Sequence, residues 1–291
     1  MRKTPLWMVP AHLAPGDSKS LGGDWSGLEL HRVASLEDPF FDMAFGALWA
    51  EFGVVGEMEH AAVLEQRMRW NPAEMRDGAS LQYALLLLTH AGKFVAVRDH
   101  TVILLEDEPG AVVHLSHNLV APEWRRSGIA GWLRALPVST ALDSLKAMGR
   151  AADSPITLVA EMEHFDPHRQ ATWVRLTAYE KAGFKMVDPS RVNYLQPDFR
   201  YPRTIDLEGG AKPLPLCLML RRAGREGEGF VTAEEVLRAV RGLYKMYATG
   251  FRSIDMKVVY ESLETYPGPG ELVALVPPTR IALPPTPTDK G

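Results

Sequence analysis

A short polar turn between two predicted elements has the residue types needed to bind a phosphate group. The stretch EWRRSGIAGWL begins at residue 123, after an apolar run that predicts a strand, and it leads into a segment that predicts a helix. The first N–H groups of a helix lack partners within the helix and lie at the positive end of its dipole, so they attract anions. Gly128 and Ala130 remove side-chain bulk, which lets a ligand approach the backbone. Ser127 offers an N-cap hydroxyl, and Arg125 and Arg126 add permanent charge, so the turn is predicted to hold a diphosphate.

Two common nucleotide-binding patterns do not occur in the chain. There is neither a G-x-x-x-x-G-K-[ST] segment for a nucleoside triphosphate nor a G-x-G-x-x-G segment for a dinucleotide. An ordinary strand–helix turn with surface arginines is the alternative interpretation of residues 123–133.

Imidazole and carboxylate side chains occur inside two other apolar runs that predict strands. His114 and His117 lie in the run over 111–122, and Glu161 and Glu163 lie in the run over 155–164. Because an unpaired buried carboxylate is costly, such positions suggest a function. The two glutamates are two residues apart, so they face the same side of a strand. They are candidates for a general base, and the alternative is a structural carboxylate with satisfied hydrogen bonds or a strand end that reaches solvent.

A metal site is the third chemistry considered for these residues. Glu161, His164 and His168 are ligand types, but Pro167 disrupts the helix that would align the two histidines, so no metal is expected. Cys217 is the only cysteine, which excludes disulfides within the chain and zinc sites built from cysteines.

The elements that must position these residues follow the order β-α-α-β-β-β-α-β-α-β-β. Strands are predicted over 28–35, 81–90, 93–107, 111–122, 155–164, 185–188 and 215–224, and helices over 38–53, 56–70, about 128–149 and 171–184. Pro39 is expected at the first position of its helix, and Pro137 is expected to kink or end the helix that contains it. The order predicts an α/β fold (α+β in the sense of a mixed sheet) with helices on the faces of the sheet.

Residues outside this core divide into three segments. Residues 1–27 predict an irregular N-terminal arm, 230–265 a helical extension and 266–291 a proline-rich mobile tail. In the extension, Thr232 and Glu235 have capping-box spacing, and the residues that follow form an apolar stripe. That stripe is expected either to pack on the chain's own core or to form a homodimer.

Two motifs resemble those of the GCN5-related N-acetyltransferase (GNAT) superfamily. Residues 125–130 read R-x-x-G-x-A, which is similar to the family's acyl-CoA-binding pattern Q/R-x-x-G-x-G/A. Residues 178–184 read AYEKAGF, which is similar to the family's closing Y-x-x-x-G-F element, and a predicted strand separates the two motifs. The resemblance covers roughly residues 28–222 and implies a GNAT-like acyl-CoA N-acyltransferase fold.

The resemblance implies a co-substrate and its contacts. Acetyl-CoA would be the acyl donor, with no metal, and the strand before the first motif would diverge from its neighbour to admit the pantetheine arm. An N–H of that strand would stabilise the oxyanion while an amine attacks the thioester directly in a ternary complex. The implied cofactor contacts are Leu119, Val120, Arg125, Arg126, Ser127, Gly128, Ile129 and Ala130.

The catalytic residues follow from the same resemblance. Tyr179 occupies the family's tyrosine position and would donate a proton to the departing thiolate, and a core tyrosine is the alternative. No motif selects the base, so His117, Glu161 and Glu163 all remain candidates. Thr172 stands where the family commonly has an asparagine, which leaves one cofactor contact without its usual residue.

Composition limits the partners. A net charge of −4 and a pI near 6.2 argue against binding to nucleic acid or an acidic membrane, and a cytoplasmic location is expected. The acceptor is an amine of unknown identity, and four glutamates near the first two predicted helices favour a cationic one: Glu51, Glu57, Glu59 and Glu65. The alternatives are a catalytically silent CoA sensor or interaction module and, more remotely, acylation of a hydroxyl or aminoacyl-type transfer on the same fold.

Overall fold

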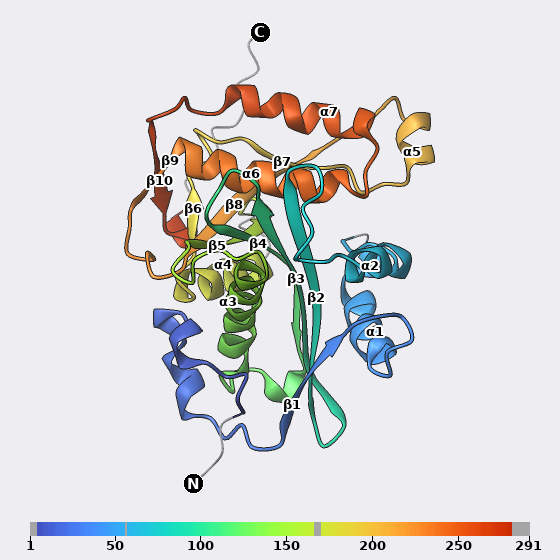
Figure 1. Cartoon of the computed structure of the whole chain (residues 1–291), viewed down its shortest axis with the longest axis vertical. Coiled ribbons are helices and arrows are strands. Elements are labelled where there is room, and N and C mark those ends of the chain that lie inside the picture. Colours follow the sequence, from blue (N-terminus) through green and yellow to red (C-terminus); the bar gives the residue numbers. More distant parts are fainter. Residues whose placement is uncertain (1–4, 56, 166–169, 281–291) are drawn as a thin grey trace.

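A ten-stranded mixed sheet forms the centre of this computed structural model, which describes residues 5–55, 57–165 and 170–280 (Figure 1). The strand order is β1-β2-β3-β4-β5-β8-β6-β10-β9, and β7 pairs with β8 beside this path. The strands are β1 (Leu28–Val33), β2 (Ala79–His90), β3 (Lys93–Leu105), β4 (Ala111–Val120), β5 (Ile156–Met162), β6 (Lys185–Val187), β7 (Tyr194–Gln196), β8 (Leu214–Arg222), β9 (Phe230–Thr232) and β10 (Leu272–Val276). The predicted mixed α/β fold is confirmed.

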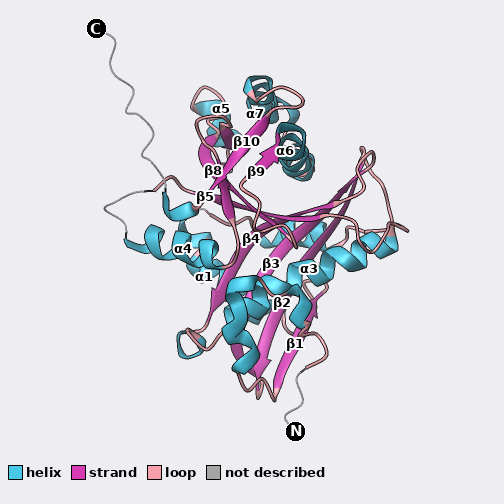
Figure 2. Ribbon diagram, turned by 90° about the vertical axis from the view of Figure 1, so that its left-hand side faces the viewer, coloured by secondary structure: helices cyan, strands magenta, loops and turns pink. Residues whose placement is uncertain are grey.

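Helices cover both faces of the sheet (Figure 2). They are α1 (Phe41–Glu51), α2 (Ala61–Met68), α3 (Ile129–Ala147), α4 (Gln170–Lys181), α5 (Pro202–Leu207), α6 (Ala233–Ala248) and α7 (Ser253–Ser262). The packing clusters place α3 and α4 on one face, and α1, α2 and α6 on the other. None of the described helices is long and apolar enough to cross a membrane.

The prediction for Pro39 is wrong, and the helix that contains Pro137 does not end there. Pro39 lies in the turn before α1, which begins at Phe41. Pro137 lies inside α3, which continues without interruption to Ala147. A proline in a helix interior costs about 3 kcal/mol, and the burial of twelve α3 residues offsets that cost.

The divergence of β4 and β5 is the feature of the sheet that shapes the candidate site. The two strands run parallel and pair from Ala111 and Ile156 as far as His114 and Val159. Beyond that point β4 continues along β3, whereas β5 continues along β8 as far as Met162. The edges of β4 and β5 that face each other are therefore unpaired over their last residues.

A bulge lies at the same level of β4. Arg98 of β3 is opposite Asn118, but His100 is opposite Leu115, so β4 has two residues where β3 has only Asp99. A bulge of this kind re-aims the side chains around it. It brings Ser116 and His117 to the sheet face covered by α1 and α6, and it returns Asn118 to the α3 face.

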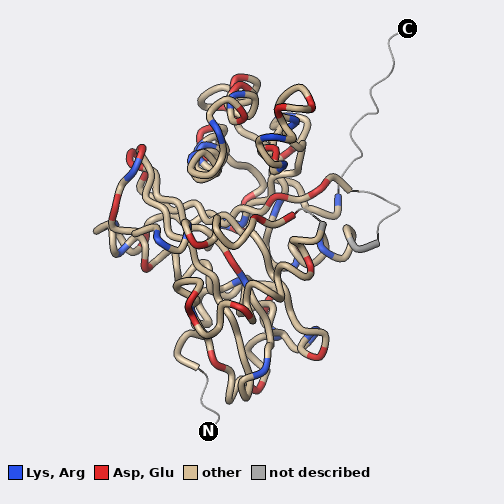
Figure 3. Tube along the Cα trace, turned by 90° about the vertical axis from the view of Figure 1, so that its right-hand side faces the viewer, with Lys and Arg blue, Asp and Glu red and all other residues tan. Residues whose placement is uncertain are grey.

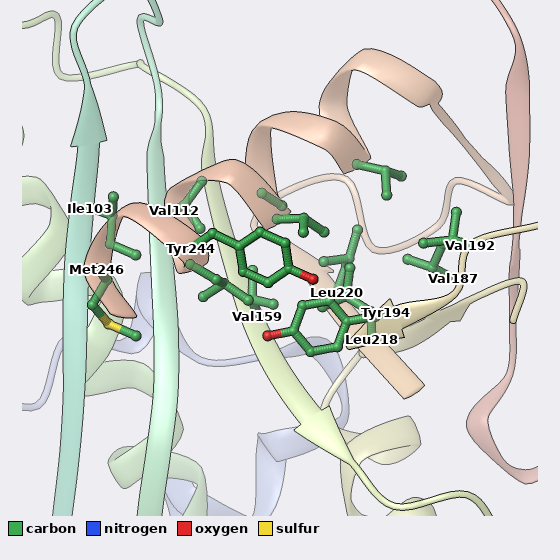
Figure 4. Close-up of a cluster of buried hydrophobic side chains, with 14 of the residues drawn as sticks. Ile103, Val112, Val159, Val187, Val192, Tyr194, Leu218, Leu220, Tyr244 and Met246 are labelled. Atoms are coloured by element: carbon green, nitrogen blue, oxygen red, sulfur yellow. The ribbon is translucent and has the colours of Figure 1, made fainter. Parts of the chain in front are cut away.

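The C-terminal extension packs on the sheet of its own chain. The stripe of α6 joins a cluster that includes residues of β3, β4, β5 and β8 (Figure 4). The N-cap is Thr232, whose Oγ1 accepts a hydrogen bond from the Glu235 N–H at 3.2 Å, as the capping-box spacing predicts. The stripe is thus buried within its own chain, which is the first of the two predicted alternatives.

Three short elements and one later strand are absent from the sequence prediction. They are β7, α5 and β9, together with β10, which lies in the segment predicted as a mobile tail and pairs with both β6 and β9. Three-residue strands and a six-residue helix are too short to show a hydrophobic period.

The N-terminal arm packs against α3. Its 3₁₀ helix Pro15–Gly22 places Ser20 where the Ser20 Oγ donates to the Gly128 carbonyl at 2.6 Å. The Ser20 carbonyl accepts hydrogen bonds from the indoles of Trp25 and Trp132 at 2.7 and 3.1 Å. Asp17 pairs with Arg134 of α3.

Candidate active site

The turn between β4 and α3 exposes positive charge at the start of a helix. Gly128 is the N-cap of α3, with φ of 101°, and Ser127 precedes it rather than occupying the cap as predicted. The Ser127 Oγ still accepts a hydrogen bond from the N–H of Ile129, the first residue of α3, at 3.2 Å. Arg125 and Arg126 are both exposed, and the Arg125 Nε donates to the Val120 carbonyl at 3.2 Å. These groups have the charge and position to bind a diphosphate.

The small residues of this turn are required by the N-terminal arm. A Cβ on Gly128 would lie 3.2 Å from the Lys19 carbonyl oxygen and the Ser20 Cα, and one on Gly131 would lie 2.1 Å from the Ser20 Oγ. The positive φ of Gly128 is a second reason for glycine there. Close approach of the arm therefore explains Gly128, whereas the sequence argument attributed it to room for a ligand.

Backbone N–H groups of β4 point into the gap between β4 and β5. The Ala121 N–H donates to the Val95 carbonyl of β3 at 2.9 Å. Since direction alternates along a strand, Asn118 and Val120 direct their backbone groups away from β3, toward the gap. The hydrogen bond from Arg125 to the Val120 carbonyl agrees with this direction. The side chains of Leu119 and Val120 pack on opposite faces of the sheet.

Tyr179 lies on α4, on the α3 side of the sheet. Its half-buried ring meets Phe184 edge to face, with ring centroids 5.0 Å apart, and packs on the cluster that includes β5 residues. Within the described residues its hydroxyl has no hydrogen-bond partner. Gly183, with φ of 78°, ends this segment after α4, as the sequence predicts.

Glu161 is the centre of a buried hydrogen-bond network on the opposite face. Its carboxylate accepts from His114 Nε2 at 2.8 Å, from the Tyr247 hydroxyl at 2.6 Å, from Gln196 Nε2 at 3.1 Å, and from the Tyr194 hydroxyl. Burial alone would raise the pKa of Glu161, but the hydrogen bond and electrostatic attraction to His114, with the hydrogen bonds from Tyr194 and Tyr247, outweigh burial and lower it. Glu161 is therefore ionised, and its lone pairs are already occupied.

Ser116 extends this network toward the gap. Its Oγ lies 3.4 Å from His114 Nδ1, while the other ring nitrogen of His114 bonds to Glu161. With the ring proton on Nε2, assigned from these partners, Nδ1 is the acceptor of the pair. The arrangement Ser116–His114–Glu161 places a base between a hydroxyl and an orienting carboxylate.

Sequence reasoning missed several members of this network. His114 was noted but not selected, and Tyr247 was assigned to the apolar stripe, where its ring does pack. Tyr194 comes from the unpredicted strand β7, and Figure 4 shows its ring beside that of Tyr244. The available signal was a polar histidine two residues before a serine inside an apolar strand.

Glu163 has a different environment from Glu161. The strand ends at Met162, so the expected alternation does not extend to Glu163. Its side chain is 41% exposed and pairs with Arg175 of α4 at 2.6 Å. The prediction that both glutamates face the same side of a strand is wrong for this reason.

His117 forms a buried ion pair with Asp99. Its backbone N–H and its Nδ1 both contact the Asp99 Oδ1, at 2.7 and 3.0 Å, and its Nε2 lies 3.0 Å from the Glu57 carbonyl. Burial lowers the pKa of His117, but the charge of Asp99 outweighs burial and raises it to about 9. Both ring nitrogens thus act as donors, and His117 has no lone pair free for a substrate proton.

Acidic residues near α1 and α2 are only partly available to an acceptor. Glu59 pairs with the buried Arg67, and Glu65 pairs with Arg69. Glu51 and Glu57 are exposed. Figure 3 shows Lys and Arg interspersed with Asp and Glu along the trace.

The described part of the chain contains no group of three or more side chains arranged to hold a metal ion. His168 and Pro167, from the metal alternative, lie outside the described residues. His164 lies 3.3 Å from the Cys217 sulfur through its Nδ1, and burial raises the pKa of that thiol to about 11.

Comparisons with known proteins give distant similarities of structure. No protein-family model matches the chain, and no curated protein matches it. An aminoglycoside acetyltransferase from an uncultured soil metagenomic sample, in complex with trehalose, is 15% identical, with a TM-score of 0.33 over 52% of this chain and 86% of its own. A tandem GNAT protein from the clavulanic acid biosynthesis pathway is 14% identical, with a TM-score of 0.33 over 82% of this chain and 64% of its own. The yncA protein of Salmonella typhimurium, with its cofactor acetyl-CoA, is 13% identical, with a TM-score of 0.34 over 68% of this chain and 95% of its own.

The fold assignment stands on features of this chain itself. The motif turn joins β4 to α3, the second motif lies at the end of α4, and β4 and β5 run parallel and then diverge between them. The chain therefore has a mixed α/β fold with a C-terminal helical extension.

Proposed function

We propose that this protein is an acyl-CoA-dependent N-acyltransferase, with acetyl-CoA as the donor. The observation that carries the proposal is the gap between β4 and β5, which has a basic helix start at one end and a buried base on one face. The diphosphate would bind at Arg125, Arg126 and the first N–H groups of α3, and the pantetheine arm would lie along the unpaired edge of β4.

The transfer step uses groups on both faces of the sheet. The amine attacks the thioester carbonyl from the α1 and α2 side, and the N–H groups of Asn118 and Val120 stabilise the oxyanion. His114 takes the amine proton through Ser116, and Glu161 orients the ring and stabilises its charged form, as a carboxylate does beside a histidine base. Tyr179, on the other face, donates a proton to the thiolate that leaves.

Binding of acetyl-CoA to the purified protein tests the donor. Calorimetry should detect saturable binding, and Arg125→Glu should weaken it about tenfold or more, because a charge-assisted contact becomes a repulsion. Arg203→Glu is the matched control, since Arg203 is exposed on α5, away from the turn. Wild-type protein without binding, or equal effects of the two substitutions, would refute the donor site.

A mass-spectrometric screen of amines with acetyl-CoA tests the reaction. We expect at least one amine to gain an acetyl group, and Tyr179→Phe to slow turnover of that amine by about a hundredfold or more. Full turnover by the Tyr179→Phe variant would remove its role as the acid. Saturable CoA binding without transfer to any amine would instead assign the protein as a CoA sensor.

A further inference from the structure

Arg98 is a buried cation whose guanidinium has no hydrogen-bond partner among the described residues. The residue is 3% exposed, and its Nε is buried without any hydrogen-bond acceptor. Among the described residues, no carboxylate or carbonyl group bonds to its guanidinium. An unpaired charge in the interior is costly, and such groups are retained mainly where a ligand completes them.

The position of Arg98 shows which ligand could reach it. It lies in the middle of β3, opposite Asn118 of β4, next to the bulge at the start of the gap. Side chains along a strand alternate between the two faces of the sheet. The next residue, Asp99, faces the α1 side, where its carboxylate contacts Tyr83 and His117. Arg98 therefore points to the other face, the α3 and α4 side.

Tyr179 approaches the same place from the opposite side of the gap. It packs over β5 from α4, and it is near enough to Arg98 for a favourable electrostatic interaction. The neighbouring cation Arg134 is already paired with Asp17. Among the described residues, the surroundings of Arg98 thus contain a cation and a phenol without hydrogen-bond partners. The charge of Asp99 acts on Arg98, but that carboxylate faces the other side of the sheet, so no anion contacts the guanidinium.

The remaining groups near Arg98 do not supply that anion. Both ring nitrogens of His100 are buried without a partner, and burial with the nearby charge of Arg98 holds the pKa of His100 well below its usual value. Burial lowers the pKa of Arg98 to about 10, so it is still charged at neutral pH. The diphosphate has its own arginines at the turn, and the acceptor amine would approach from the other face.

We propose that Arg98 is a catalytic residue that binds the donor sulfur and stabilises it as a thiolate. This inference rests on the proposed function. As the nitrogen–carbon bond forms, the carbon–sulfur bond breaks and its electron pair stays on sulfur, beside Arg98. The amine proton goes to His114, and the thiolate then takes a proton from Tyr179, which is reprotonated from solvent.

The test compares CoA with desulfo-CoA, which lacks the sulfur. Calorimetry measures both dissociation constants one pH unit below and one above the ordinary thiol pKa of about 8.5. In the wild type, the preference for CoA over desulfo-CoA should rise up to about tenfold between the two pH values, because the thiolate fraction of free CoA rises about tenfold between them. In Arg98→Met the preference should stay flat while desulfo-CoA binds within about twofold of the wild type, and Arg98→Lys should keep part of the rise.

Each other outcome has a definite meaning. A flat preference in a wild type that binds both ligands would overturn the thiolate site and leave the proposed function standing. If the wild type binds neither ligand, the proposed function fails and this inference fails with it. A last outcome concerns acyl groups that carry a carboxylate. In this outcome the wild type binds succinyl-CoA more tightly than acetyl-CoA, and Arg98→Met loses that difference while its preference for CoA over desulfo-CoA stays as in the wild type. Arg98 would then bind an acyl carboxylate, and the thiolate role would be wrong.

Discussion

The substitution Glu161→Gln tests the buried network that positions the proposed base. Four donors converge on this carboxylate, from His114, Tyr194, Gln196 and Tyr247. A glutamine at this position keeps the shape, but it replaces one acceptor oxygen by an NH₂ group that faces donors. It also removes the charge that strengthens every one of these hydrogen bonds.

The expected loss follows from the number of bonds and their burial. A hydrogen bond to a charged group contributes about 1.5–3 kcal/mol, and at least one donor loses its acceptor altogether. Breaking one partner of a buried ionic network costs about 3–5 kcal/mol. We therefore expect the free energy of unfolding to fall by about 3–5 kcal/mol. At about 2–4 °C per kcal/mol for a chain of this size, Tm should fall by roughly 6–20 °C.

The free energies of unfolding of Glu161→Gln and Glu163→Gln, measured by urea denaturation, distinguish the buried network from a general effect of this substitution. The two glutamates are two residues apart and undergo the same chemical change, but Glu163 is 41% exposed and pairs with Arg175 in solvent. Its substitution should cost at most about 1 kcal/mol. The wild type should also lose stability as pH falls, because the pKa of Glu161 is lowered in the folded state, and Glu161→Gln should lose less. Equal costs for the two variants would refute the network as described.

Three further measurements test other parts of the structure. The pKa of His117 is raised from 6.5 to about 9, so its charged form adds to the free energy of unfolding. This contribution, about 3 kcal/mol at most, is complete below pH 6.5 and is lost as pH rises through 9. Denaturation of His117→Gln should not show this loss. Gly131→Ala should displace Ser20 and the N-terminal arm, which costs about 1–3 kcal/mol and speeds proteolysis there, whereas Gly46→Ala in open space on α1 should be neutral or stabilising. Arg98→Met should leave Tm unchanged or raise it, because it removes an unpaired buried charge, and a large fall in Tm would show that Arg98 has a structural partner.

The fold could be predicted from the sequence wherever elements were long enough to show a period. The hairpin between β2 and β3 is an example, because Ala91 and Gly92 have the positive φ values of 49° and 71° that a tight turn requires. The stripe of α6 is another, since its period and its cap both agree with the structure. Strand β10 could not be predicted, because its place in the sheet depends on β6 and β9 rather than on its own five residues.

The candidate site was predictable only where it follows the chain locally. The turn at Arg125 and Gly128 is contiguous, so its charge and helix start are visible in the sequence. The partners of Glu161 are not contiguous, because they lie 33 to 86 residues away on β4, β7 and α6. Glu161 and Glu163 also look equivalent in the sequence. Their environments differ because β5 ends at Met162, so Glu163 lies beyond the strand.

The C-terminal extension changes how the candidate site should be understood. Without the extension, Glu161 would lose the Tyr247 hydroxyl of α6, and its carboxylate would open to the space now filled by that ring. His114 would remain as a donor, together with Tyr194 and Gln196 of β7, a strand outside the extension. Burial raises the pKa of Tyr194 and of Tyr247 well above the usual value, and the adjacent carboxylate raises both further, so each remains a neutral donor. Two neutral donors lower the proton affinity of Glu161 and keep it an anion beside His114, which is the state that a histidine base requires. The extension therefore contributes to the electrostatics of the proposed base, in addition to covering the sheet.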